Sequence, residues 1–205
     1  MTTTTSPRSP LLLASRSATR RHLLEAAGVE FETVTCELDE EQAKQGLLAA
    51  GFEPRDLAEM LAELKANNAP APSSALVLGA DQTLELPDGG LLNKPGSQGE
   101  AREQLLMLAG RTHWLHSAAV IVRGGERLWG CTESVELRMR PLGEAFLDDY
   151  LEREYAHVRW NVGAYRIEGP GVQLFERIDG SHFAILGLPL LPLLAFLREQ
   201  GLLHS

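Results

Sequence analysis

Two serines and three arginines crowd the start of an expected helix. Residues 15–21 read Ser-Arg-Ser-Ala-Thr-Arg-Arg and follow a short apolar run at residues 11–14, which predicts a buried strand. Ser17 is a good helix N-cap, and cations at the positive end of a helix dipole each cost about 0.3–1 kcal/mol unless an anion is bound. Free backbone N–H groups, hydroxyls and guanidinium groups together suit a phosphate. The alternative interpretation is a solvent-facing basic turn with an ordinary serine cap.

A carboxylate follows the next apolar strand along the chain. Residues 75–80 read Ala-Leu-Val-Leu-Gly-Ala and predict a buried strand that stops at Asp81. A strand end at a sheet edge would hold this carboxylate rigidly, in a place that suits catalytic or metal-binding groups. An isolated Asp at that place could equally cap a turn.

Three other segments carry weaker signals. Pro95 restricts the backbone of Lys94 and could help present its ammonium group to a phosphate. Residues 168–171, Glu-Gly-Pro-Gly, form a glycine-rich turn that either lets the backbone approach a ligand or simply closes a hairpin. The acidic run at residues 37–41 is typical of a solvated face. None of these segments decides the function by itself.

The elements that must position these groups mix helices and strands without a regular βαβ series. We expect strands at residues 11–14, 31–34, 75–80, 113–123, 133–139 and 174–178, and helices at residues 17–27, 54–66, 101–108, 144–153 and 189–200. A turn at residues 87–90 predicts a hairpin. The pattern predicts an α/β fold, with a disordered tail at residues 1–9 and one folded domain over residues 10–205.

Composition narrows the range of partners. The chain has 205 residues and a formal net charge of −9, which argues against nonspecific nucleic-acid binding and against an anionic membrane surface. Its apolar runs are too short to span a bilayer. We therefore expect a cytoplasmic protein with no nucleic-acid partner and no membrane partner.

Five segments in order give the chain a family resemblance. LLLASRSATRRHLLEAAGVEFE, VLGADQT, LNKP, LAGRTHWLHSAAVI and GSHFAILGLPL resemble the successive signatures of the Maf family of nucleoside triphosphate pyrophosphatases. The resemblance covers nearly the whole chain after residue 9. It implies a mixed twisted sheet flanked by helices with a central cleft, similar to the inosine triphosphate pyrophosphatases.

The resemblance also implies roles for particular residues and for a metal. Asp81 matches the catalytic proton acceptor, although its carboxylate could instead be a metal ligand. The residues that match the triphosphate site are Ser15, Ser17, Arg20, Lys65 and Lys94. Glu40 matches a carboxylate that serves a divalent cation, Mg²⁺ or Mn²⁺. The resemblance further implies a homodimer.

Three positions bear on which nucleobase is bound. Thr19 replaces an arginine of the branch that acts on dTTP and UTP, and Gln82 and Glu168 are more similar to the branch that acts on 7-methyl-GTP. Glu168 could accept hydrogen bonds from guanine or face a methylated, cationic ring. We therefore expect hydrolysis of a nucleoside triphosphate, with 7-methyl-GTP favoured. The competing hypothesis is a noncatalytic nucleotide-binding regulator of cell division, which would need the phosphate site but not Asp81.

Overall fold

A mixed β-sheet forms the centre of the molecule. The computed structural model describes residues 11–204, so the predicted tail at residues 1–9 lies outside the described residues. Within that part of the chain, seven strands form one sheet in the order β2-β1-β3-β5-β6-β7, and β4 pairs with β3. Parallel pairing joins β1 to β2 and to β3, and all other pairs are antiparallel. The predicted mixed α/β fold is confirmed.

The strands are β1 (Leu11–Ala14), β2 (Glu32–Thr33), β3 (Leu76–Glu85), β4 (Leu91–Leu92), β5 (Thr112–Arg123), β6 (Glu126–Met139) and β7 (Phe175–Asp179). The α-helices are α1 (Ala18–Ala26), α2 (Glu40–Ala49), α3 (Pro54–Asn67), α4 (Gln98–Leu108), α5 (Glu144–Val158), α6 (His182–Ile185) and α7 (Leu190–Glu199). Two 3₁₀ turns, η1 (Val162–Ala164) and η2 (Pro170–Leu174), connect α5 to β7. Among the described helices none combines the length and the apolar character needed to span a bilayer.

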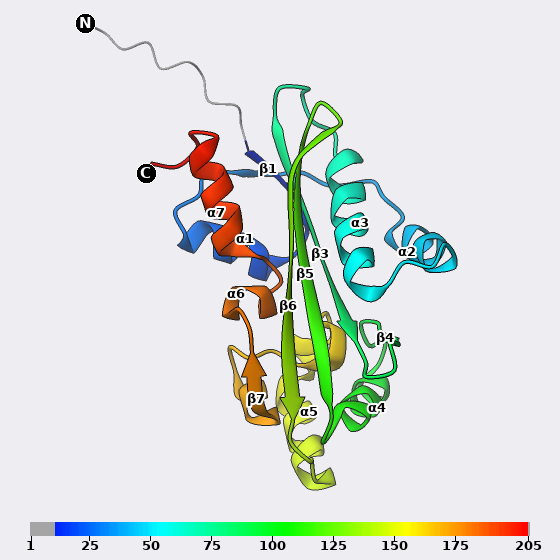
Figure 1. Cartoon of the computed structure of the whole chain (residues 1–205). Helices are drawn as coiled ribbons and strands as arrows, with labels where there is room; N and C mark the ends of the chain where they lie inside the picture. The colour runs from blue at the N-terminus through cyan, green and yellow to red at the C-terminus, as the bar shows by residue number, and fades with distance from the viewer. Residues whose placement is uncertain (1–10, 205) are drawn as a thin grey trace, which may run out of the picture.

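Helices cover both faces of the long strands (Figure 1). Helices α1 and α7 pack on one face, where Leu24 and Leu193 belong to one apolar core with Leu78. Helix α3 packs on the other face through small side chains such as Ala58 and Ala62. Helices α4 and α5 enclose a third core at the far end of the sheet. The molecule thus has two packed ends joined by continuous strands.

The edge of β3 is open in its middle. Strand β1 pairs with β3 only as far as Ala14 opposite Gly79, and β4 begins to pair with it at Leu84. Strand β5 pairs with the other side of β3 throughout, including Asp81 opposite Ala118. The expected strand end at Asp81 is therefore wrong: β3 continues to Glu85 because β5 supplies hydrogen-bond partners beyond the point where β1 ends. Asp81 lies within a strand, at a gap in the sheet edge.

Helix α3 approaches β3 closely because Gly79 has no side chain. A Cβ atom at Gly79 would lie 1.9 Å from the Ala62 carbonyl oxygen and 2.8 Å from the Ala66 nitrogen. Both neighbours are backbone atoms of α3, so the helix could not make room by changing a rotamer. This contact sets the distance between Lys65 on α3 and Asp81 on β3.

The sequence did not predict helix α2. None of its residues is buried, so it lacks the apolar periodicity that reveals an amphipathic helix. Its N-terminal signal was present, because Asp39 caps it by accepting from the Gln42 N–H at 3.0 Å, with Glu40 and Glu41 in the first turn. The acidic run is thus the start of a helix.

Candidate active site

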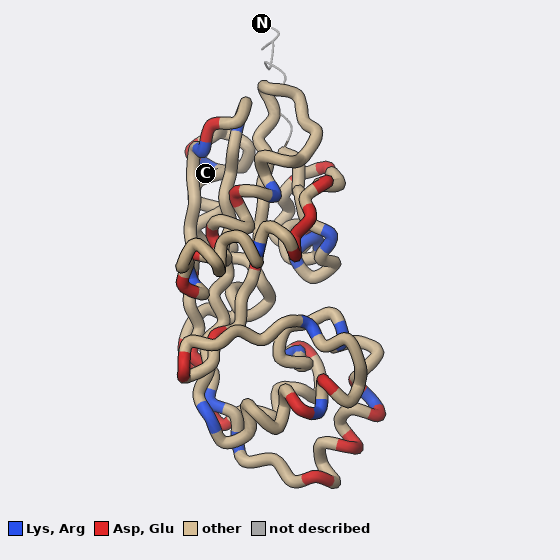
Figure 2. The backbone as a smooth tube through the Cα atoms, turned by 90° about the vertical axis from the view of Figure 1, so that its right-hand side faces the viewer, with Lys and Arg blue, Asp and Glu red and all other residues tan. Residues whose placement is uncertain are grey.

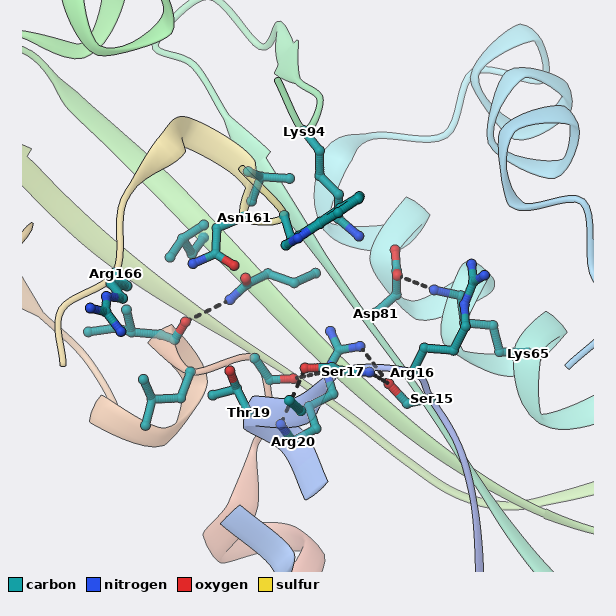
Figure 3. Close-up of a pocket in the computed structure, with 18 of the residues that line it drawn as sticks. Ser15, Arg16, Ser17, Thr19, Arg20, Lys65, Asp81, Lys94, Asn161 and Arg166 are labelled. Carbon is teal, nitrogen blue, oxygen red and sulfur yellow. Dashed lines mark hydrogen bonds and ion pairs between the residues drawn. The ribbon is translucent and has the colours of Figure 1, made fainter. Parts of the chain in front are cut away.

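A cleft of about 650 Å³ lies at the open edge of β3. Figure 3 shows Ser15, Ser17 and Arg20 on one side of it and Asn161 and Arg166 on the other. The cleft wall contains every site residue that the sequence predicts: Ser15, Ser17, Thr19, Arg20, Glu40, Lys65, Asp81, Gln82, Lys94 and Glu168. A volume of this size suits a small-molecule ligand.

The loop between β1 and α1 presents two hydroxyl groups to the cleft. Ser17 caps α1 as predicted, since its Oγ accepts from the Arg20 N–H at 3.3 Å. The Oγ of Ser15 accepts from the Ser17 N–H and from Arg20 Nη1, each at 3.3 Å. The loop is therefore held from within, and both hydroxyl hydrogens remain to be donated to a ligand.

Arg20 holds two backbone segments of the cleft together by hydrogen bonds. It is buried, and its Nε donates to the Gly187 carbonyl at 2.7 Å while Nη1 donates to the Ala80 carbonyl at 2.9 Å. The Ala80 carbonyl lies on the open edge of β3, so Arg20 replaces the missing neighbouring strand there. Burial lowers the pKa of Arg20, and the nearby Asp81 and Glu40 oppose this effect. Arg21, in contrast, is exposed on the outside of α1.

An alternating chain of charges leads from the surface to Asp81. The Lys65 Nζ lies 2.6 Å from Asp81 Oδ1 and 2.8 Å from Glu40 Oε2, and Arg16 lies 3.2 Å from Glu40 Oε1. The Lys65 side chain is only 9% exposed and that of Asp81 16%, so their ion pair is shielded from water, whereas Glu40 is 43% exposed. Burial alone would raise the pKa of Glu40, but Lys65, Arg16 and Lys94 outweigh it and hold that pKa below its ordinary value.

Lysine occurs only three times in the chain, and all three lysines interact with Asp81. Lys94 lines the cleft, and burial and the charge of Lys65 lower its pKa while Asp81 raises it. Lys44 on α2 donates to the side-chain oxygen of Asn93, the residue before Lys94. Burial lowers the pKa of Lys44, and the negative charge of Asp81 offsets only part of this shift. Lys44 was not predicted as a site residue, because its helix lacks the apolar periodicity by which a sequence reveals a helix.

Two carboxylates are close enough to share a cation. Asp81 and Glu40 contact the same ammonium nitrogen of Lys65. Within residues 11–204 no group of three or more His, Cys, Asp or Glu side chains is arranged to hold a metal ion by itself. A metal at this place would therefore need oxygen atoms from a ligand or from water to complete its coordination.

Gln82 and Asp81 reach the cleft from opposite faces of the sheet. The Gln82 Nε2 donates to Ser117 Oγ at 2.8 Å and to the Ala184 and Ile185 carbonyls at 3.0 and 3.1 Å. With its nitrogen directed to these acceptors, the side-chain oxygen is the group of Gln82 left for a ligand. Thr19 is half-buried in the same wall.

The far wall holds a fixed cation and an exposed carboxylate. Arg166 forms an ion pair with the buried Glu154, through Nε at 2.7 Å and Nη2 at 3.3 Å. Glu168 is exposed on the cleft wall and forms no ion pair within 4.0 Å in the described part of the chain. Its charge contributes to the raised pKa of Arg166, for which the Glu154 hydrogen bond is the main cause. The carboxylate of Glu168 is thus available to a ligand.

Comparisons with known proteins identify the family of this chain. The family model described as "Maf-like protein" matches residues 10–200. A Caulobacter vibrioides protein named nucleoside triphosphate pyrophosphatase is 50% identical over 195 residues, covering 95% of this chain and 98% of the relative. Proteins named 7-methyl-GTP pyrophosphatase from Rhizobium meliloti and Brucella abortus are 46% and 44% identical, covering 95% and 93% of this chain and 98% and 96% of the relatives. The chain belongs to the family of Maf-like proteins.

Proposed function

We propose that this chain hydrolyses a nucleoside triphosphate to the nucleoside monophosphate and pyrophosphate. The observation that carries the proposal is the position of Asp81, which lines a cleft together with the hydroxyl-bearing N-terminus of α1 and two lysines, Lys65 and Lys94. The names of the relatives describe this reaction. A binding module would gain nothing from a negative charge beside its phosphate site, whereas hydrolysis needs a base there.

The triphosphate would lie between the Ser15–Ser17 loop and Lys94. The Ser15 and Ser17 hydroxyls and the first N–H groups of α1 suit phosphate oxygens. Lys94 would neutralise the charge that develops on the departing pyrophosphate, and Lys44 would add a positive charge that binds the phosphates equally in the ground and transition states. Arg20 contributes a fixed positive charge beneath the phosphates, since two of its nitrogens already donate to backbone carbonyls.

Asp81 is placed to accept a proton from the attacking water. The water oxygen forms a bond to the α-phosphorus, the bond from that phosphorus to the bridging oxygen breaks, and pyrophosphate leaves. The water proton passes to Asp81, whose orientation is held by Lys65 through Oδ1. If Asp81 instead binds a metal, another group must take the proton, and the two roles predict different effects of substitution.

Mg²⁺ or Mn²⁺ is the proposed cofactor. Glu40 and Asp81 would hold the ion, because both carboxylates already lie within reach of one cationic nitrogen. Magnesium is commonly bound by one or two carboxylates together with substrate phosphates and water. When bound, the ion supplies positive charge to the phosphate oxygens.

The nucleobase would lie against the far wall, where Glu168 and Gln82 offer oxygen acceptors. These acceptors suit the N–H groups of guanine, and a carboxylate also suits a positively charged 7-methylated ring. We therefore propose 7-methyl-GTP as the preferred substrate. The homodimer and the cytoplasmic location stay predictions from the sequence.

A panel of nucleoside triphosphates with Mg²⁺ or Mn²⁺ tests the proposal. We expect pyrophosphate and not orthophosphate, with the fastest turnover for 7-methyl-GTP. In ¹⁸O-labelled water the label should enter the monophosphate, because water attacks the α-phosphorus. Asp81→Asn should lower kcat by about 10²–10⁴-fold, the usual contribution of a general base. Asp149→Asn is the matched control and should leave kcat unchanged, because it removes an exposed carboxylate whose ion-pair partner within residues 11–204 is Arg153.

Each other outcome selects a different function. Release of orthophosphate would identify a phosphatase. Nucleotide binding without turnover of any nucleotide would overturn the proposal in favour of a regulator. A loss of activity in Asp81→Asn that excess Mn²⁺ restores would assign Asp81 to the metal.

A further inference from the structure

Trp160 is an exposed aromatic side chain on the wall of the cleft. It lies in the turn between α5 and η1, and 65% of it is accessible to water. The other exposed large hydrophobic side chains in residues 11–204 have smaller exposed fractions. An indole ring in water loses the hydrophobic stabilisation that burial would provide, so its position needs an explanation.

One face of the indole ring is already occupied. The Arg159 guanidinium carbon lies 4.6 Å from the centre of the Trp160 ring. The turn that carries the ring is itself held, because the Asn161 N–H donates to the Val158 carbonyl at 2.9 Å and the Asn161 side chain donates to the Tyr165 carbonyl at 3.0 Å. The other face of the ring is left for a second planar group.

The charge against the Trp160 ring is positive, because the Arg159 guanidinium already occupies one face. The free face therefore suits stacking by a planar base rather than a second cation. Stacking of a base on an aromatic side chain contributes about 1–3 kcal/mol, and a purine has a larger ring system to stack than a pyrimidine. On the same wall Arg166 is neutralised by Glu154, whereas Glu168 is exposed and forms no ion pair within the described residues.

We infer that Trp160 is the stacking platform for the nucleobase, and that it selects purines over pyrimidines. This inference rests on the proposed function, because it assumes that the phosphates lie at the Ser15–Lys94 side of the cleft. A base stacked on Trp160 would lie at the opposite wall, with its edge toward Glu168.

Kinetics of Trp160 variants test the inference. Trp160→Ala should raise KM for 7-methyl-GTP and for GTP about 10-fold, with a smaller rise for UTP. Trp160→Phe should retain most of the affinity, since it keeps an aromatic face. Inorganic tripolyphosphate, which has no base, should inhibit the wild type and Trp160→Ala equally. Leu191→Ala removes a side chain that is 61% exposed and outside the cleft, and should change none of these values.

A binding measurement keeps the inference separate from the reaction. Titration with the α,β-methylene analogue of 7-methyl-GTP should quench tryptophan fluorescence in the wild type and much less in Trp160→Phe, which retains Trp114 and Trp129. If the wild type releases no pyrophosphate, the proposed function fails while these dissociation constants still test stacking. Equal weakening of all nucleotides and of tripolyphosphate, or unchanged affinity in Trp160→Ala, would overturn the inference.

Discussion

At the scale of single residues, key side chains of the site each contact more than one partner. Lys65 contacts two carboxylates at once, and Arg20 contacts two backbone carbonyls and one hydroxyl. Such groups cannot be replaced singly without leaving a buried charge or acceptor unpaired. Lys44 differs, because Asn93 is the only hydrogen-bond partner of its side chain within residues 11–204 and the residue is only half-buried. It is therefore the residue whose role in phosphate binding can be tested most cleanly.

Replacing Lys44 should weaken substrate binding more than catalysis. Lys44→Gln should raise KM for the triphosphate about 10-fold with kcat nearly unchanged, because one charge-assisted contact is lost in both ground and transition states. Lys44→Arg should retain most of the affinity, and Arg153→Gln, an exposed charge on α5, is the control. Steady-state kinetics at low salt would measure the effect. An unchanged KM would mean that Lys44 only ties α2 to Asn93.

At the scale of elements, the site is set by the packing of α3 on β3. Gly79 allows the close approach that brings Lys65 to Asp81. Helix α2 is different in kind, because it buries no residue and is held by the ion pairs of Glu40 and the hydrogen bond of Lys44. One helix is therefore fixed by its core contacts and the other by the charges of the site.

Gly79→Ala should displace α3 and weaken the site. The added methyl group would collide with backbone atoms of the helix, and overpacking of this kind costs about 1–3 kcal/mol in the free energy of unfolding. Gly46→Ala is a matched control, because its Cβ meets nothing within 4 Å and alanine is favoured over glycine within a helix by about 1 kcal/mol. Urea denaturation should thus show opposite signs for the two variants. Equal stability of Gly79→Ala and wild type would contradict the close packing.

At the scale of the whole molecule, acidic and basic positions are interspersed along the described backbone (Figure 2). The net charge is −9, so the cations of the cleft act locally. His113 is a fully buried titratable group next to the cleft. Its Nε2 is 2.9 Å from the hydroxyl of Tyr165, which lines the cleft, and its Nδ1 has no partner within residues 11–204. Burial lowers its pKa from 6.5 to about 4.

His113 should make the protein less stable in mild acid. Because folding lowers this pKa, the unfolded chain binds the proton more readily, so the stability contribution is complete above pH 6.5 and is lost as the pH falls toward 4. The loss should reach about 2 kcal/mol near pH 5. His113→Gln should lower stability at neutral pH but remove this part of the pH dependence. The check is urea unfolding of both proteins from pH 7.5 to 5, and parallel pH profiles would contradict it.

The sequence by itself determined the features that short-range forces set. Ser17 caps α1 as expected, because a cap needs only its own next three residues. The apolar periodicity at residues 54–66 identified α3, and the turn at residues 87–90 identified the hairpin of β3 and β4. The order of the motifs identified the family and brought together ten residues that line one cleft.

Only the tertiary structure decided what depends on distant partners. Strand β3 continues past Asp81 because β5 pairs with it, and the site is open there because β1 ends at Ala14. Arg20 donates to Gly187 and Ala80, which lie 167 and 60 residues away in sequence. No local sequence pattern could therefore reveal that Arg20 links these two backbone segments. Helix α2 and the role of Trp160 were not predicted from the sequence for a related reason. Neither is buried in the core, and residues outside the core leave no hydrophobic periodicity in the sequence.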